Sequence, residues 1–150
     1  MNNYPDSEGP DEPNEATSNR PLRVLLVEDS AAVAERIAGQ IDALDGVELV
    51  ATVESEIAAV DSLRRGGLDA VVLDLTLKQG SGFGVLRSRQ ALGLPVAIVV
   101  YTSYDIPAYR RAAAVFGASE FLNKARDHDK LPLVLKDLAT AAATRRTPLA

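Results

Sequence analysis

Five short runs of β-forming residues alternate with segments of helical spacing from residue 22 onwards. The runs lie at 22–27, 47–53, 70–73, 95–101 and 120–122. Strands that alternate with helices in this way form a parallel sheet whose two faces are covered by those helices. The sequence therefore predicts an α/β fold, a doubly wound parallel sheet of five strands.

The helical segments are marked by apolar spacing and by residues that start and stop helices. They are predicted at about 31–44, 54–65, 83–92, 106–117 and 129–143. Ser30 is placed to cap the first of these helices, and Gly46 lies just past its end. Ser81 is a candidate cap for the third helix. Pro107 suits the first turn of the fourth helix.

Length and composition favour one globular domain with tails. The chain has 150 residues, of which 47% are hydrophobic, which suits one core better than two. We place the domain at residues 21–143. Residues 1–20 are acidic and polar without apolar periodicity, which predicts a disordered tail, and residues 144–150 are predicted to fray.

Several classes of function are disfavoured by composition. The chain has no cysteine and one histidine, His128, so any metal is expected to be a hard, oxygen-ligated ion. A net charge of −5 argues against nucleic-acid binding, and basic pairs such as Arg110-Arg111 are interpreted as solvated helix faces. No apolar run approaches the ~20 residues of a membrane span, and the start lacks a secretory signal, so a cytoplasmic protein is expected.

Polar side chains follow four of the five predicted strands at the point where each strand ends. Glu28 and Asp29 follow the first strand, Asp74 the third, Thr102 ends the fourth, and Lys124 follows the fifth. Because the carboxyl ends of parallel strands meet at one edge of the sheet, we expect these side chains to lie together.

The residue types at this edge suit phosphoryl transfer. Crowded carboxylates repel one another, and Mg²⁺, which prefers oxygen ligands, relieves that repulsion. The predicted ligands are Glu28, Asp29, Asp74 and the backbone carbonyl of Thr76. Asp74 is then the nucleophile for a phosphoryl group. The oxygens of the phosphoryl group would be contacted by the ammonium group of Lys124 and the hydroxyl of Thr102.

Taken in order, Glu28-Asp29, Asp74 followed by Gly82, Thr102-Ser103 and Lys124 resemble the receiver domain of two-component response regulators over residues 22–143. The resemblance implies a flavodoxin-like (βα)5 fold with strand order 2-1-3-4-5. It also implies a signalling phosphoacceptor rather than an enzyme, in which Asp74 takes a phosphoryl group, with Mg²⁺, from a phosphohistidine on a sensor kinase or phosphotransfer protein. The implied switch residues are Thr102 and Phe121.

The chain departs from the family pattern at several positions. Ala125 follows Lys124 where the family usually has proline, which disfavours a cis peptide bond there, because that bond costs ~3 kcal/mol without proline. Lys78 also replaces a frequent proline. Phe121 has no hydroxyl group, so a signal at this position must pass by packing. Tyr104 borders the expected site, where its bulk is expected to slow attack by water.

The expected output is a contact made by the receiver itself, because the residues after Lys124 suffice for one helix and a short tail. We expect a protein partner to bind the surface formed by the helices at 106–117 and 129–143 and the strand at 120–122. One alternative is a degenerate receiver that binds partners without phosphorylation. Another is a phosphohydrolase of the haloacid dehalogenase type, which is disfavoured because it needs a second aspartate where this chain has Thr76.

Overall fold

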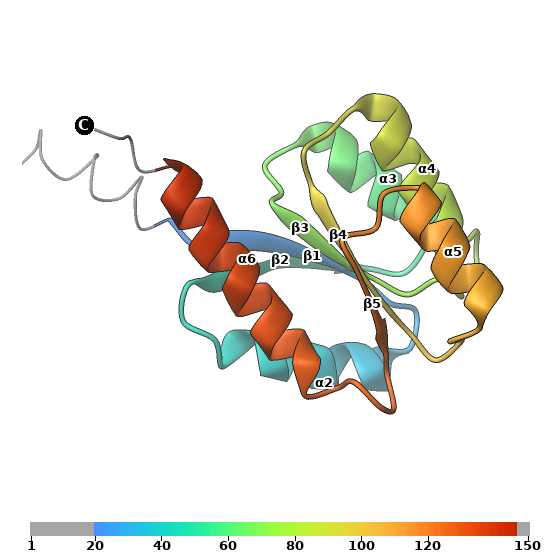
Figure 1. Ribbon diagram of the computed structural model, residues 1–150, viewed down its shortest axis with the longest axis horizontal. Helices are drawn as coiled ribbons and strands as arrows, with labels where there is room; N and C mark the ends of the chain where they lie inside the picture. The colour runs from blue at the N-terminus through green and yellow to red at the C-terminus, as the bar shows by residue number, and fades with distance from the viewer. Residues whose placement is uncertain (1–19, 147–150) are drawn as a thin grey trace, which may run out of the picture.

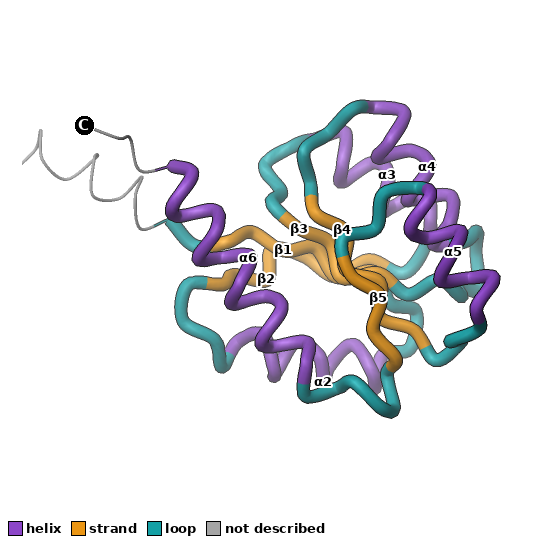
Figure 2. The backbone as a smooth tube through the Cα atoms, in the orientation of Figure 1, coloured by secondary structure: helices purple, strands orange, loops and turns teal. Residues whose placement is uncertain are grey.

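A five-stranded parallel sheet lies between two layers of helices in the computed structural model, which describes residues 20–146 (Figures 1 and 2). In chain order the elements are β1 (Leu22–Val27), α2 (Ala31–Asp42), β2 (Val47–Val53), α3 (Glu56–Arg65), β3 (Ala70–Leu73), α4 (Gly82–Leu92), β4 (Ala97–Thr102), α5 (Pro107–Val115), β5 (Glu120–Asn123) and α6 (Lys130–Arg146). The strand order is β2-β1-β3-β4-β5, and every pairing is parallel, which confirms the predicted fold.

The central strands divide their side chains between two hydrophobic clusters, one on each face of the sheet. In β1, Val24 and Leu26 enter the cluster with α2 and α6, whereas Leu25 and Val27 enter the cluster with α3, α4 and α5. Figure 1 shows α2 and α6 on one side of the sheet and the other three helices on the opposite side. All four residues of β3 are therefore buried, whichever face of the sheet they occupy, and this strand is a continuous apolar run in the sequence.

Two elements begin two residues later than the sequence predicts, for local reasons. The hydroxyl of Ser55 accepts a hydrogen bond from Ala58 N at 3.2 Å, so it caps α3 two residues after the predicted start. The fourth strand begins at Ala97 rather than Pro95, because proline has no N–H to donate, whereas Ala97 N donates to Asp69 O at 3.0 Å.

The last helix extends beyond its predicted end at residue 143. Residues 144–146 belong to α6 in the structure. Ala142 is buried in the core, and the hydroxyl of Thr144 donates to the carbonyl of Thr140 at 3.0 Å. The run of alanines in this stretch favours the helix. The remaining parts of the predicted tails at 1–20 and 144–150, namely residues 1–19 and 147–150, lie outside the described residues.

None of the helices in the described part of the chain is both long enough and apolar enough to cross a membrane.

Candidate functional site

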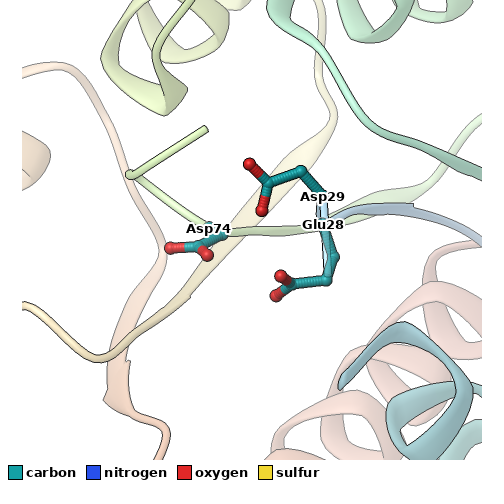
Figure 3. A group of neighbouring side chains, drawn as sticks. All are labelled: Glu28, Asp29 and Asp74. Atoms are coloured by element: carbon teal, nitrogen blue, oxygen red, sulfur yellow. The ribbon is translucent and has the colours of Figure 1, made fainter. Parts of the chain in front are cut away.

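Three carboxylates gather at the carboxyl ends of β1 and β3, which are neighbours in the sheet. Glu28 and Asp29 follow β1 directly, and Asp74 follows β3, with its backbone N–H donating to Val27 O at 3.1 Å. One oxygen from each carboxylate lies within 4.8 Å of the others (Figure 3). The structure thus brings together the three acidic residues that the sequence predicts as metal ligands.

Backbone N–H groups hold each of these carboxylates in place. Glu28 Oε2 accepts from the N–H two residues later at 3.1 Å, and Asp74 Oδ1 accepts from Thr76 N at 3.2 Å. Asp29 Oδ2 accepts from Lys78 N at 2.6 Å. Glu28 and Asp74 are also buried, at 2% and 7% exposure. Hydrogen bonds from fixed backbone groups orient the three carboxylates and aim their remaining oxygen lone pairs.

Lys124 supplies the positive charge inside this cluster. Its Nζ lies 2.6 Å from Glu28 Oε1 and 2.9 Å from Asp74 Oδ2. Burial disfavours the charged ammonium, but hydrogen bonds to Glu28 and Asp74 outweigh that effect, and the pKa of Lys124 is raised above its ordinary value. Its backbone N–H is fixed to Thr102 O at 3.0 Å. The described residues contain no cis peptide bond, as expected for Lys124-Ala125.

The cluster opens into a cleft of about 480 Å³ at this edge of the sheet. The cleft is lined by Glu28, Asp29, Ser30, Val33, Asp74, Thr76, Leu77, Lys78, Ser103, Tyr104 and Lys124. Its donors to a cation are carboxylate oxygens from two strand ends, which fits a hard ion such as Mg²⁺ and does not fit a soft metal.

Thr102 is not among the residues that line this cleft, although the next two residues, Ser103 and Tyr104, are. Its side chain is fully buried, and Oγ1 accepts a hydrogen bond from Tyr104 N at 3.3 Å. Tyr104 itself is 54% exposed and lines the cleft, as expected from its position near the site. The threonine hydroxyl is therefore tied to the loop that forms the cleft wall, so a movement of Thr102 would be transmitted to that loop.

Phe121 faces a different surface, and its main polar neighbour is Arg110. The ring packs against the cluster of α3, α4 and α5, and the Arg110 guanidinium carbon lies 4.6 Å from the ring centroid. Phe121 also lines a second cleft, of about 470 Å³, between α5, β5 and α6. The Arg110 side chain is 41% exposed, and its guanidinium also makes cation–π and ionic contacts that the prediction of a solvated face did not include.

Asp105, in the loop between Thr102 and α5, joins these elements. Its carboxylate accepts two hydrogen bonds from Arg110, one from Asn123 Nδ2 at 3.3 Å and one from Arg126 at 2.5 Å. The hydrogen bond from the Arg110 guanidinium is the main reason that the pKa of Asp105 lies well below its usual range, and the donors of Asn123 and Arg126 lower it further. Sequence reasoning missed this network, because Asp105 and Arg110 are not at a spacing that marks a helical ion pair.

The chain is similar to known proteins in both sequence and structure. A family model described as the response regulator receiver domain matches residues 24–136. A solved structure of the signal receiver domain of a putative Luxo repressor protein from Vibrio parahaemolyticus has a TM-score of 0.75 and 26% identity, and the match covers 84% of this chain and 95% of that one.

Two full-length relatives extend well beyond the matched region. Protein-glutamate methylesterase/protein-glutamine glutaminase 5 of Anaeromyxobacter dehalogenans (strain 2CP-C) is 35% identical over 114 residues, which cover 73% of this chain and 31% of that protein. Response regulator protein PmrA of Pseudomonas aeruginosa is 31% identical over 127 residues, which cover 85% of this chain and 57% of that protein. The chain thus spans less than two thirds of either relative.

Proposed function

This chain belongs to the response regulator receiver domain family of two-component signalling, and we propose that it signals by accepting a phosphoryl group on Asp74. The observation that carries the proposal is the position of Lys124, 2.9 Å from Asp74 Oδ2 within a cluster of three carboxylates. A cation beside a buried nucleophilic carboxylate suits an acceptor of phosphoryl oxygens.

In the proposed reaction, an Asp74 carboxylate oxygen attacks the phosphorus of a phosphohistidine on a sensor kinase or phosphotransfer protein. The O–P bond forms as the N–P bond breaks, and the electron pair of the N–P bond goes to the departing imidazole. Bound Mg²⁺ supplies charge that offsets repulsion between the carboxylates and the phosphoryl oxygens. Glu28, Asp29 and the carbonyl of Thr76 hold that ion with Asp74. Lys124 and Thr102 donate to the phosphoryl oxygens.

We expect the protein to gain one phosphoryl group from acetyl phosphate in the presence of Mg²⁺, and to gain none in excess EDTA. Intact-mass spectrometry measures the gain, and reduction of the acyl phosphate by borohydride locates it, because it converts the modified aspartate to homoserine. Asp29→Asn is expected to reduce the gain severalfold at limiting Mg²⁺. A chain that gains nothing, or gains equally with and without EDTA, is not a phosphoacceptor of this kind and fits the degenerate binding module.

The proposed output passes from Thr102 to the surface formed by α5, β5 and α6. Thr102 is bonded to the loop that carries Asp105, and Asp105 holds the Arg110 guanidinium over Phe121. A phosphoryl group that draws Thr102 toward Asp74 therefore pulls on Arg110 and lets the ring repack, although the ring has no hydroxyl group. The second cleft lies on this surface, where Val115 and Leu133 are exposed, at 73% and 63%, and we propose it as the place where a protein partner binds.

We expect the ring of Phe121 to report beryllofluoride, a phosphoryl mimic, in protein labelled with fluorophenylalanine. The chain has three phenylalanines, so ¹⁹F NMR resolves Phe121 beside two internal references. Its resonance should shift with beryllofluoride and Mg²⁺ in the wild type and shift much less in Arg110→Gln. Arg87→Gln is the matched control, because Arg87 lies 5.8 Å from the ring centroid of Phe116. Equal shifts in both variants would show that Arg110 carries no signal.

A further inference from the structure

The loop that follows Asp74 is fixed next to the acidic cleft by backbone hydrogen bonds. Lys78 N donates to Asp29 Oδ2 at 2.6 Å, so the loop orients one of the proposed metal ligands directly. The same loop carries Thr76, whose carbonyl is another proposed ligand. Gly82 N donates to Leu75 O at 3.0 Å and closes the loop on itself. Any displacement of this loop therefore moves two proposed ligands together.

Glu56, in the first turn of α3, fixes the far end of this loop. Its backbone N–H donates to Gln79 O at 3.2 Å, and its carboxylate Oε1 accepts from Ser81 N at 2.9 Å. Ser55 forms an isolated parallel bridge with Gln79. Ser81 is the residue that caps α4, so one side chain from α3 joins the end of the loop to the start of the next helix.

Two glycines leave space that the Glu56 side chain fills. A Cβ on Gly80 would lie 2.7 Å from Glu56 Oε1, and a Cβ on Gly84 would overlap the Glu56 carboxyl group. Gly80 also has a φ of +82°, a conformation that other residues rarely adopt. The three atoms nearest to a Cβ on Gly84 all belong to Glu56, so this position within α4 is kept clear for that carboxylate.

A carboxylate suits this location for an electrostatic reason. The backbone N–H groups at the start of α4 point outwards with the positive end of the helix dipole, and an ionised acceptor forms a stronger hydrogen bond with them than a neutral one does. Glu56 thus holds the loop to α3 through its carboxylate, and it is not among the residues that line the acidic cleft.

We propose that Glu56 is a positioning residue for the acidic site: it holds the loop between Asp74 and α4 so that Asp29 and the Thr76 carbonyl face the metal. The inference rests on the proposed function, because it assigns Glu56 a role only in a site that binds Mg²⁺. Groups that orient metal ligands from outside the coordination sphere typically change metal affinity by about 10- to 100-fold when they are removed.

The test is calorimetric titration of the full chain with Mg²⁺ alone. Glu56→Ala should raise the Kd for Mg²⁺ about tenfold. Glu56→Gln keeps an acceptor for Ser81 N and should recover most of the lost affinity. Asp61→Ala removes an exposed carboxylate from the same helix and should leave the Kd unchanged. A Kd in Glu56→Ala equal to that of the wild type overturns the inference while leaving the proposed function intact, whereas a wild type that binds no Mg²⁺ overturns both.

Gly84→Ala keeps the proposal testable if Glu56→Ala folds poorly. In the wild-type background the added methyl group displaces the Glu56 carboxylate, so the Kd for Mg²⁺ should rise as it does in Glu56→Ala. In the Glu56→Ala background the same methyl group meets no carboxylate, and alanine favours the helix, so thermal stability should increase with no further change in Kd. Additive effects of the two substitutions on the Kd would overturn the inference.

Discussion

Asp74→Asn is expected to abolish phosphoryl uptake from acetyl phosphate, lowering the rate by more than about a thousandfold, because the amide is not a nucleophile. The variant should fold. Its amide oxygen can accept the hydrogen bond that Thr76 N gives to Asp74 Oδ1 at 3.2 Å. Its amide NH₂ then faces Lys124, and since both groups are donors, Lys124 keeps only its 2.6 Å contact with Glu28.

The measurement is intact mass over time at saturating Mg²⁺, with circular dichroism to confirm folding. Asp42→Asn is the matched control, because it removes an exposed carboxylate at the end of α2 with the same change in charge and size. It should be phosphorylated at the wild-type rate. Phosphoryl uptake by Asp74→Asn at that rate would assign the acceptor to another carboxylate and remove the basis of the proposed function.

Much of the fold could be predicted because each central strand is buried on both faces. The strands at 22–27, 47–53 and 70–73 have the predicted bounds. The strand at 70–73 is an unbroken apolar run because helices cover both faces of the sheet there. The strand at 47–53 lies at the edge of the sheet and is largely exposed, and it is recognised by its β-branched residues instead. Helix ends were less predictable. They depend on single hydrogen bonds, such as the one from Ala58 N to the hydroxyl of Ser55 at 3.2 Å, which begins α3.

The grouping of Glu28, Asp29, Asp74 and Lys124 could be predicted for a topological reason. Each follows a strand directly, and the strands run parallel, so sequence order alone brings the four side chains to one edge of the sheet. No long-range contact had to be guessed. Thr102 was predicted at the same edge, but it is buried and does not line the cleft, which depends on the path of the loop that follows and leaves no pattern in the sequence.

Glu56 and Arg110 could not be found from the sequence, because their partners are set by tertiary structure. The Glu56 carboxylate bonds to a residue 25 positions away, and the Arg110 guanidinium packs on a ring from the next strand. Neither contact follows helical or strand periodicity. One signal that could have pointed to Glu56 is the pair of glycines around the start of α4, Gly80 and Gly84. Gly84 lies within the helix, where a better helix former would otherwise be favoured.

Lys124→Gln is expected to have opposite effects on the two steps at the site. Mg²⁺ should bind about tenfold more tightly, because the ammonium group at 2.6 and 2.9 Å from two carboxylates no longer opposes the ion. Phosphoryl uptake at saturating Mg²⁺ should fall about a hundredfold, because a charged donor to the phosphoryl oxygens is lost. Calorimetry measures the first effect and intact mass the second.

Charge can be separated from shape with Lys124→Arg, which should keep a Kd for Mg²⁺ close to that of the wild type while its planar guanidinium still slows phosphoryl uptake.

The pH dependence of the Kd for Mg²⁺ gives a further check. The pKa of Lys124 is raised, so the stability from its charge is fully present below the ordinary lysine pKa of about 10.4 and is lost only as the pH rises through the raised value. The difference in Kd between the wild type and Lys124→Gln should therefore stay constant from about pH 7 to about pH 9. A weaker affinity for Mg²⁺ in Lys124→Gln would mean that the lysine supports the metal site instead of competing with it.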